Sequence, residues 1–194
     1  MGEEGEMLSV DLFYCIGPPR FVVDQGQTLS HADMISEVVN RWLAESRVRF
    51  RPLSCDRAED QKSRRVRADN LASGRVYILA DDDCLPQLKP FVLSAWNLAM
   101  SMSGQYGMLS LMPDNANIYP WSEGEEDRNV MEHVSVGGIR FCVKGAMEKW
   151  PPMEGPGYDR THADQLRRQG LKVGYFKDFK MTHLGEGSST VWGL

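Results

Sequence analysis

Apolar residues recur along the chain at two different spacings, and these predict alternating strands and helices. Short apolar runs bounded by Gly, Pro or polar residues are typical of buried strands, whereas apolar positions three or four residues apart are typical of one helix face. Strands are therefore expected over five ranges: Val10–Ile16, Val48–Leu53, Val76–Ala80, Tyr106–Met112 and Lys172–Phe176. A sixth range, Val130–Lys144, is predicted to form a strand, a Gly-Gly turn and a second strand.

Helices are predicted between several of these strands. The first has Thr28 or Ser30 as a possible cap, and its apolar positions are Met34, Ile35, Val38, Val39, Trp42 and Leu43. A short helix is expected in the charged segment Asp56–Asn70, and longer ones over Pro86–Met100 and Asp159–Gln169. Residues 113 to 129 are polar and predict a loop. The order of elements predicts an α/β fold with a partly parallel sheet, without an internal repeat.

Size, charge and cysteine usage narrow the class of protein. With 194 residues and a net charge of −5, the chain is the size of one soluble domain. Its apolar stretches are too short to span a bilayer, and its acidic start does not resemble a signal peptide, so we expect a cytoplasmic protein without a membrane partner. The four cysteines, Cys15, Cys55, Cys84 and Cys142, form no Cys-x-x-Cys pair, which favours reduced, buried thiols over disulfides or a zinc site.

Three consecutive aspartates, Asp81, Asp82 and Asp83, follow the strand over Val76–Ala80 and precede Cys84-Leu85-Pro86. Three carboxylates at the end of a buried strand repel one another unless a cation lies between them, and divalent cations prefer oxygen ligands. The alternative is a solvated acidic loop. Because ligands of open α/β sheets bind at the carboxyl ends of the strands, the sequence favours a cation site there.

The later motifs extend this picture. Gly137-Gly138, a helix from Asp159 to Gly170 and then His183-Leu184-Gly185 follow the acidic triplet in that order. Together with the segment Arg64–Gly74 before the acidic strand, they resemble the GT-A-fold nucleotide-sugar glycosyltransferases, in particular the family 2 type. The resemblance spans roughly residues 8 to 187. The chain departs from the family pattern at Tyr158, where a Glu is usual, and at Gly17-Pro18-Pro19-Arg20 after the first strand.

The resemblance implies a single GT-A (Rossmann-like) domain over residues 8–194, with a mixed, mostly parallel central sheet flanked by helices. Residues 1–7 are expected to be a flexible N-terminus, 8–100 the nucleotide- and metal-binding half, and 101–194 the acceptor half. It also implies that Asp83 is the principal metal ligand, with His183 and Asp81 as further ligands. Asp81 is expected to face the nucleotide ribose as well, and Asp82 is an intermediate residue of the donor site. One imidazole beside carboxylates suits Mn²⁺, with Mg²⁺ as the alternative.

The remaining site residues are assigned by the chemistry of transfer. An inverting reaction needs a general base, for which Asp159 is the candidate and Glu154 the reserve; the alternative for Asp159 is a helix cap. Arginine forks suit phosphates, so Arg64 or Arg65 is predicted to contact the diphosphate unless they form a solvated helix face. The resemblance places Asp56 and Arg57 beside the nucleotide base. It places Gly137, Gly138 and Tyr158 at the acceptor, where Trp121 either stacks on a ring or anchors its loop.

Several functions remain compatible with the sequence. The first is a metal-dependent, hexosyltransferase-like enzyme with a nucleotide-sugar donor, UDP-linked by default. A compact enzyme of this kind resembles small bacteriophage enzymes, such as the TET-associated type, that glycosylate hydroxymethylated DNA bases such as 5-hydroxymethylcytosine. A phage enzyme of this type would act in the host cytoplasm. The net acidity argues against DNA, because phosphate contacts need clustered Lys and Arg. The alternatives are a glycan or glycolipid acceptor, a metal-dependent nucleotidyltransferase and a non-catalytic binding module.

Overall fold

The computed structural model describes residues 9–24, 26–45, 47–54, 60–87, 91–114, 128–145, 158–184 and 190–192. Within them an eight-stranded sheet runs in the order β4-β1-β5-β9-β7-β10-β6, with β8 paired to β10. Its strands are β1 Val10–Ile16, β4 Val48–Ser54, β5 Val76–Asp81, β6 Cys84–Pro86, β7 Tyr106–Pro113, β8 Val130–Glu132, β9 Ile139–Val143 and β10 Lys172–His183. Five of them (β4, β1, β5, β7 and β10) run in one direction, which confirms the mixed, mostly parallel sheet.

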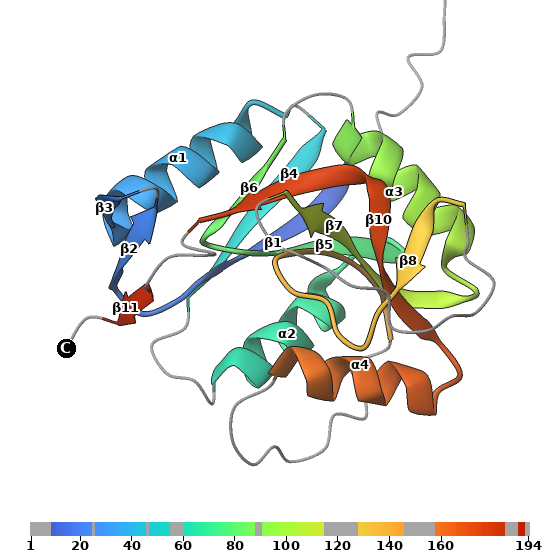
Figure 1. Cartoon of the computed structure of the whole chain (residues 1–194). Coiled ribbons are helices and arrows are strands. Elements are labelled where there is room, and N and C mark those ends of the chain that lie inside the picture. The colour runs from blue at the N-terminus through green and yellow to red at the C-terminus, as the bar shows by residue number, and fades with distance from the viewer. Residues whose placement is uncertain are drawn as a thin grey trace, which may run out of the picture.

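Helices cover both faces of this sheet (Figure 1). On one face lie α1 (His31–Leu43) and α3 (Phe91–Met102); on the other lie α2 (Asp60–Leu71) and α4 (Tyr158–Arg168). Side chains alternate between the two faces of a strand. Thus Leu12 and Tyr14 of β1 pack in the core with α1 and α3, whereas Phe13 packs in the core with α2 and α4. The α/β class predicted from the alternating pattern is confirmed.

Most of the predicted elements are present. Ser30 caps α1 by accepting a hydrogen bond from the Asp33 amide, which settles the choice between the two possible caps. The central apolar residues of that helix, Met34, Val38 and Trp42, are buried as predicted. Three of the cysteines lie in the described residues, and all three are buried and free of disulfides: Cys15, Cys84 and Cys142.

One predicted helix starts later than expected, and two predicted strands pair with partners that local pattern does not indicate. The helix expected over Pro86–Met100 is preceded by the short strand β6, which lies at the sheet edge where Pro86 is tolerated, and α3 begins at Phe91. The two strands predicted on either side of Gly137-Gly138 are present as β8 and β9, but they do not pair with each other: β8 pairs with β10, and β9 lies between β5 and β7. Local patterns identify strands, but they do not choose partners.

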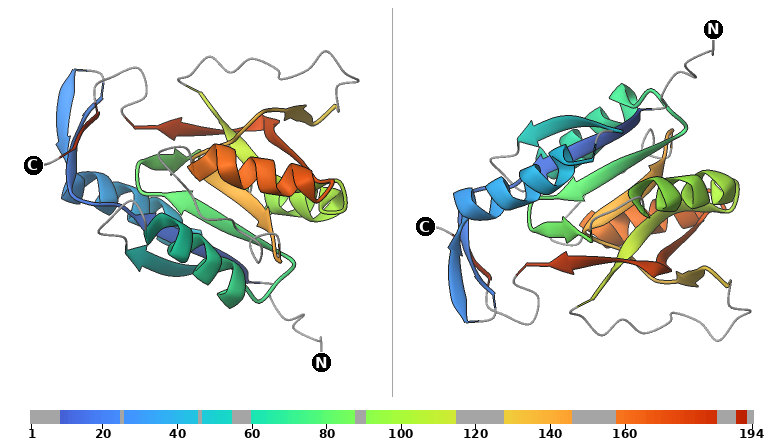
Figure 2. Two further views of the ribbon diagram at one scale, coloured as in Figure 1. Left: turned by 90° about the horizontal axis from the view of Figure 1, so that it is seen from below. Right: turned by 90° about the horizontal axis from the view of Figure 1, so that it is seen from above.

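A second sheet of three strands was not predicted. It contains β2 (Arg20–Asp24), β3 (Gln27–Ser30) and β11 (Thr190–Trp192), all antiparallel, in the order β11-β2-β3. Figure 2 shows it at one end of the molecule, beside the start of α1. This small sheet positions Arg20, the first residue of β2. The Arg20 side chain reaches the main sheet, where it pairs with Asp82.

We expect Gly138→Ala to lower the free energy of unfolding by about 2–4 kcal/mol. Gly138 has φ +73°, and a Cβ there would lie 2.3 Å from Cε of Met181 and 3.1 Å from Sγ of Cys84. Denaturant unfolding measures the loss. Gly104→Ala is the control, because a Cβ at Gly104 has no neighbour within 4 Å and its φ is not positive. Equal losses in the two variants would contradict this account of the packing at Gly138.

Candidate active site

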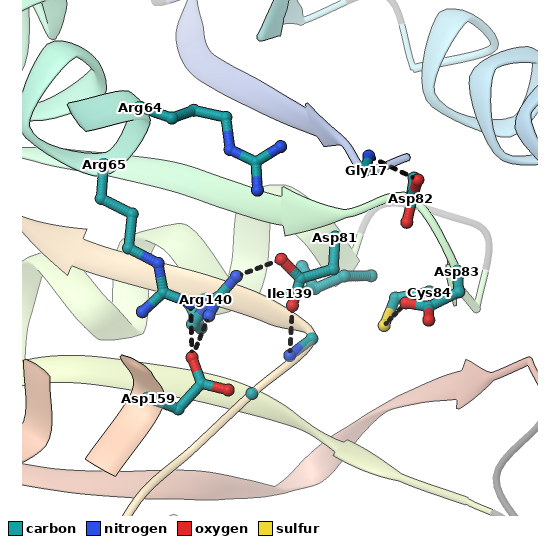
Figure 3. Close-up of polar contacts among 12 residues, drawn as sticks. Gly17, Arg64, Arg65, Asp81, Asp82, Asp83, Cys84, Ile139, Arg140 and Asp159 are labelled. Atoms are coloured by element: carbon teal, nitrogen blue, oxygen red, sulfur yellow. Dashed lines mark hydrogen bonds and ion pairs between the residues drawn. The ribbon is translucent and has the colours of Figure 1, made fainter. Parts of the chain in front are cut away.

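The acidic triplet lies at the carboxyl edge of the main sheet, as predicted. Asp81 is the last residue of β5, and Asp82 and Asp83 form the turn into β6. This turn is held by main-chain contacts, because the Leu184 amide donates to the Asp83 carbonyl at 2.7 Å and the Asp81 amide donates to the Gly138 carbonyl at 3.2 Å. Segments from β5, β9 and β10 therefore meet at this edge. Figure 3 shows the three aspartates together with Arg140 of β9.

The Asp82 carboxylate is buried and fully engaged by protein groups. It accepts hydrogen bonds from the Gly17 amide at 2.8 Å and from the Arg20 guanidinium, and Nε2 of His31 lies 2.8 Å away. Gly17 leaves room for this arrangement, since a Cβ there would lie 2.9 Å from a guanidinium nitrogen of Arg20. Asp82 thus ties the loop after β1 to the turn after β5. Its predicted contact with a donor would require these partners to be displaced.

Asp83 and His183 lie together, although they are a hundred residues apart in the sequence. The antiparallel ladder between β6 and β10 places His183 opposite Cys84, so Nε2 of His183 lies 3.8 Å from Oδ1 of Asp83. With Sγ of Cys84, these ligand atoms all lie within 4.8 Å of one another. Burial raises the pKa of the Asp83 carboxyl, against the opposing effects of His183 and Arg20. A neighbouring cation would stabilise the ionised form of a carboxylate in this environment.

Asp81 and Asp159 are joined by a buried arginine. One nitrogen of Arg140, in β9, lies 2.5 Å from Oδ1 of Asp81, and another lies 2.5 Å from Oδ1 of Asp159. The Arg65 guanidinium, from α2, contacts the same Asp159 oxygen at 2.6 Å (Figure 3). The carboxylates and guanidinium groups form one chain of ion pairs across the sheet edge.

This chain of ion pairs determines the ionisation of Asp159. Burial would raise its pKa, but the guanidinium groups of Arg65 and Arg140 lower it to about 2. The side chain stays 39% exposed. Its other oxygen, Oδ2, lies beside Gly137, where a Cβ would approach to 3.2 Å. Asp159 lies in the first turn of α4, and its side chain pairs with the arginines rather than acting as the cap considered from the sequence.

Other predicted residues have different surroundings. Arg64 is buried and donates to the carbonyls of Ile16, the last residue of β1, and of Leu53, the next-to-last residue of β4, so its described contacts are with the backbone. Gly138 donates its amide to Oδ2 of Asp81. Tyr158 begins α4, but its side chain lies outside the described residues, as do all atoms of four more predicted residues: Asp56, Arg57, Trp121 and Glu154.

The structure revises the electrostatic argument drawn from the sequence. The sequence predicts that a divalent cation offsets the repulsion among the three adjacent carboxylates. Instead, Arg140 pairs with Asp81, and Arg20 pairs with both Asp82 and Asp83. Both guanidinium groups are nearly or fully buried. The two arginines therefore offset most of the repulsion among the aspartates. Asp83 and His183 together still provide an oxygen and a nitrogen atom that can bind a metal ion.

Arg140, Arg20 and His31 were not predicted as site residues. Arg140 had a detectable signal, because it is the one charged residue within the apolar strand Ile139–Val143 and a charge in a buried strand requires partners. Arg20 and His31 had none, because their positions depend on the unpredicted small sheet and on the start of α1.

Comparison with known proteins gives structural neighbours only. No protein-family model and no curated protein matches the chain. Among solved structures it is similar to A197 from STIV (TM-score 0.55, 11% identity, 95% of this chain and 94% of that one). It is also similar to S. aureus TarS 1-349 (0.56, 10%, 89% and 59%) and to CMP:2-keto-3-deoxy-manno-octonic acid synthetase complexed with CTP (0.51, 12%, 87% and 88%). These similarities show a shared fold, in which helices flank a mixed, mostly parallel sheet.

Within the described part of the chain, no helix is long and apolar enough to cross a membrane.

The ion pairs of Asp159 predict a pH-dependent contribution to stability. Because the folded-state pKa lies near 2, below the ordinary value of about 4, the pairs stabilise the fold above pH 4 and lose that effect as the pH falls toward 2. Asp159→Asn should therefore be less stable than the wild type at pH 7, and the difference should shrink between pH 4 and 2. Denaturant unfolding over this range measures it. A difference that stays constant down to pH 2 would contradict the assignment.

Proposed function

We propose that the protein is a metal-dependent glycosyltransferase that moves a sugar from a nucleotide diphosphate sugar, a UDP-sugar by default, to an acceptor hydroxyl. One observation carries the proposal: the β6–β10 ladder brings His183 beside Asp83 at the carboxyl edge, next to Asp81. A ligand set at this edge, in a fold shared with nucleotide-using transferases, supports a site for a metal and a diphosphate.

The residues present fit a divalent cation. Two ligands each about 2.1–2.2 Å from one ion can lie up to about 4.3 Å apart, and Oδ1 of Asp83 and Nε2 of His183 are separated by 3.8 Å. Oxygen with one imidazole nitrogen suits Mn²⁺ better than Mg²⁺. The nearby Cys84 has a buried thiol whose pKa is raised well above its usual range, so it offers no thiolate at neutral pH. When bound, the ion would neutralise charge on the leaving diphosphate.

The chain's own residues would position the substrates. In the proposed reaction the acceptor oxygen attacks the anomeric carbon, and the bond from that carbon to the diphosphate oxygen breaks. The nucleotide diphosphate leaves with the bonding electrons. Asp159 is the candidate to take the acceptor proton on Oδ2, because Oδ1 already accepts from two arginines. A pKa near 2 makes it a weak base, so Glu154 remains the reserve.

The donor side is proposed around Asp81. Its carboxylate lies 29% exposed at the end of β5, which suits a contact to the ribose or to the metal. Arg65 is a candidate for the diphosphate, although its described partner is Asp159. Asp56 and Arg57 are still proposed for the nucleotide base.

The proposed acceptor is an alcohol. The hydroxymethyl group of a modified base in phage DNA is the form that the sequence resemblance favours, and such a base would have to be flipped out of its stack. A glycan or glycolipid hydroxyl is the alternative. Gly137 leaves space in front of Oδ2 of Asp159, which supports an acceptor approaching over this loop. Trp121 and Tyr158 remain proposed acceptor contacts.

Asp83→Ala tests the metal assignment. We expect it to weaken Mn²⁺-dependent binding of the nucleotide sugar at least tenfold, because the principal charged ligand is lost. Without Mn²⁺ the difference should be small. Titration calorimetry with and without Mn²⁺ measures both. Asp164→Ala is the matched control, since its carboxylate pairs with Arg160 and Arg167 on α4. If Asp83→Ala binds the nucleotide sugar with the same dependence on Mn²⁺ as the wild type, Asp83 is not a metal ligand.

A second function is a nucleotidyltransferase, which is favoured by the structural similarity to the CMP:2-keto-3-deoxy-manno-octonic acid synthetase complexed with CTP. A thermal-shift screen of nucleotide sugars and nucleoside triphosphates, each with and without Mn²⁺, separates the two. A glycosyltransferase should be stabilised by one nucleotide sugar only when Mn²⁺ is present. The expected stabilisation is about 3 kcal/mol when the ligand concentration is a hundredfold above its Kd. Stabilisation by CTP or UTP instead, with pyrophosphate released on turnover, would favour the nucleotidyltransferase.

A further inference from the structure

A structural role alone does not explain why the charged side chain of Arg140 is buried. Its side chain is fully buried, in a central strand between β5 and β7. Burying a charged group is costly unless it is paired, and replacing a buried ion pair by apolar residues of similar volume is often neutral or stabilising. Two residues on the same face of the sheet, Leu79 across the β5–β9 ladder and Cys142 two positions along β9, are buried and apolar, so an apolar residue at position 140 would suit the core.

The two carboxylates that pair with Arg140 come from opposite sides of the proposed site. Asp81 ends β5 on the donor side, and Asp159 lies in the first turn of α4 on the acceptor side. The guanidinium is planar, and its N–H groups point in fixed directions. With one nitrogen on each carboxylate, the plane of Arg140 sets the position of Asp159 relative to Asp81.

The contacts of Asp159 also fix its rotation. Both arginines contact Oδ1, from α2 and from β9. Oδ2 is directed to the space beside Gly137. The charged groups facing this carboxylate are Arg65 and Arg140. The titratable group His162 lies on the same helix as Asp159, and burial keeps it neutral by lowering its pKa.

We propose that Arg140 is a positioning residue of the transfer reaction, which holds the donor-side carboxylate Asp81 and the candidate base Asp159 in one fixed geometry. The inference rests on the proposed function. It assigns Arg140 no contact with either substrate. Its effect is exerted through Asp159, whose displacement by about 1 Å is enough to cost on the order of a hundredfold in rate.

The test is a double-variant cycle on kcat, measured at saturating donor and acceptor below the unfolding temperature of each variant. Arg140→Gln should lower kcat about a hundredfold, while the KM for the acceptor changes little. In Asp159→Asn, adding Arg140→Gln should cause little further loss, because residues that act as a unit are not additive. Arg140→Lys keeps the charge but not the two-pronged geometry, so it should recover only part of kcat.

Arg167→Gln is the matched control. Arg167 also forms an ion pair on α4, with Asp164, and it donates to the His133 carbonyl. Its loss should leave kcat nearly unchanged, and its effect should multiply with that of Asp159→Asn. If the effects of Arg140→Gln and Asp159→Asn multiply in the same way, the inference is overturned. Should Arg140→Gln fail to fold, Arg140→Lys takes its place in the cycle, and wild-type kcat in folded Arg140→Lys would also overturn it.

Failure of the proposed function gives a different result. A wild-type protein that transfers no sugar from any nucleotide sugar refutes the glycosyltransferase assignment before the variants are compared. An active wild type in which Arg140 acts independently of Asp159 refutes only the positioning role.

Discussion

The structure depends on the pairing of buried arginines with aspartates at the carboxyl edge of the sheet. Arg20 and Arg140 reach this edge from different elements, and each bridges two carboxylates. Because unpaired buried charges are expensive, each of these residues requires the others to be in place. The edge is therefore assembled only when the whole sheet is formed, with β9 inserted between β5 and β7 and the small sheet docked beside α1.

The same pairing divides the three aspartates into different roles. Asp82 is saturated by Gly17, Arg20 and His31 and holds two loops together. Asp83 is less completely engaged and faces His183. Asp81 is linked through Arg140 to Asp159. A triplet that looks uniform in sequence thus contains a structural residue, a candidate metal ligand and one end of a chain of ion pairs.

This arrangement also bears on the reaction we propose. A base flanked by two guanidinium groups is always ionised near neutral pH, but it is weak. Such a residue contributes most when proton transfer occurs late, after the acceptor oxygen has begun to bond to the anomeric carbon. Its orientation then matters more than its basicity. The contacts to Arg65 and Arg140 provide that orientation, and Gly137 keeps one oxygen accessible.

The sequence by itself determined the central elements and the acidic edge, because the periodicity of apolar residues reports how each segment is buried within its own strand or helix. β1, α1 and β5 lie where that pattern placed them. Only the tertiary structure decided which charges meet. The partners Arg140 and Asp81 are 59 residues apart, and His183 reaches Asp83 through a short edge strand that the local pattern did not predict. Those contacts follow from strand order, which local periodicity does not encode.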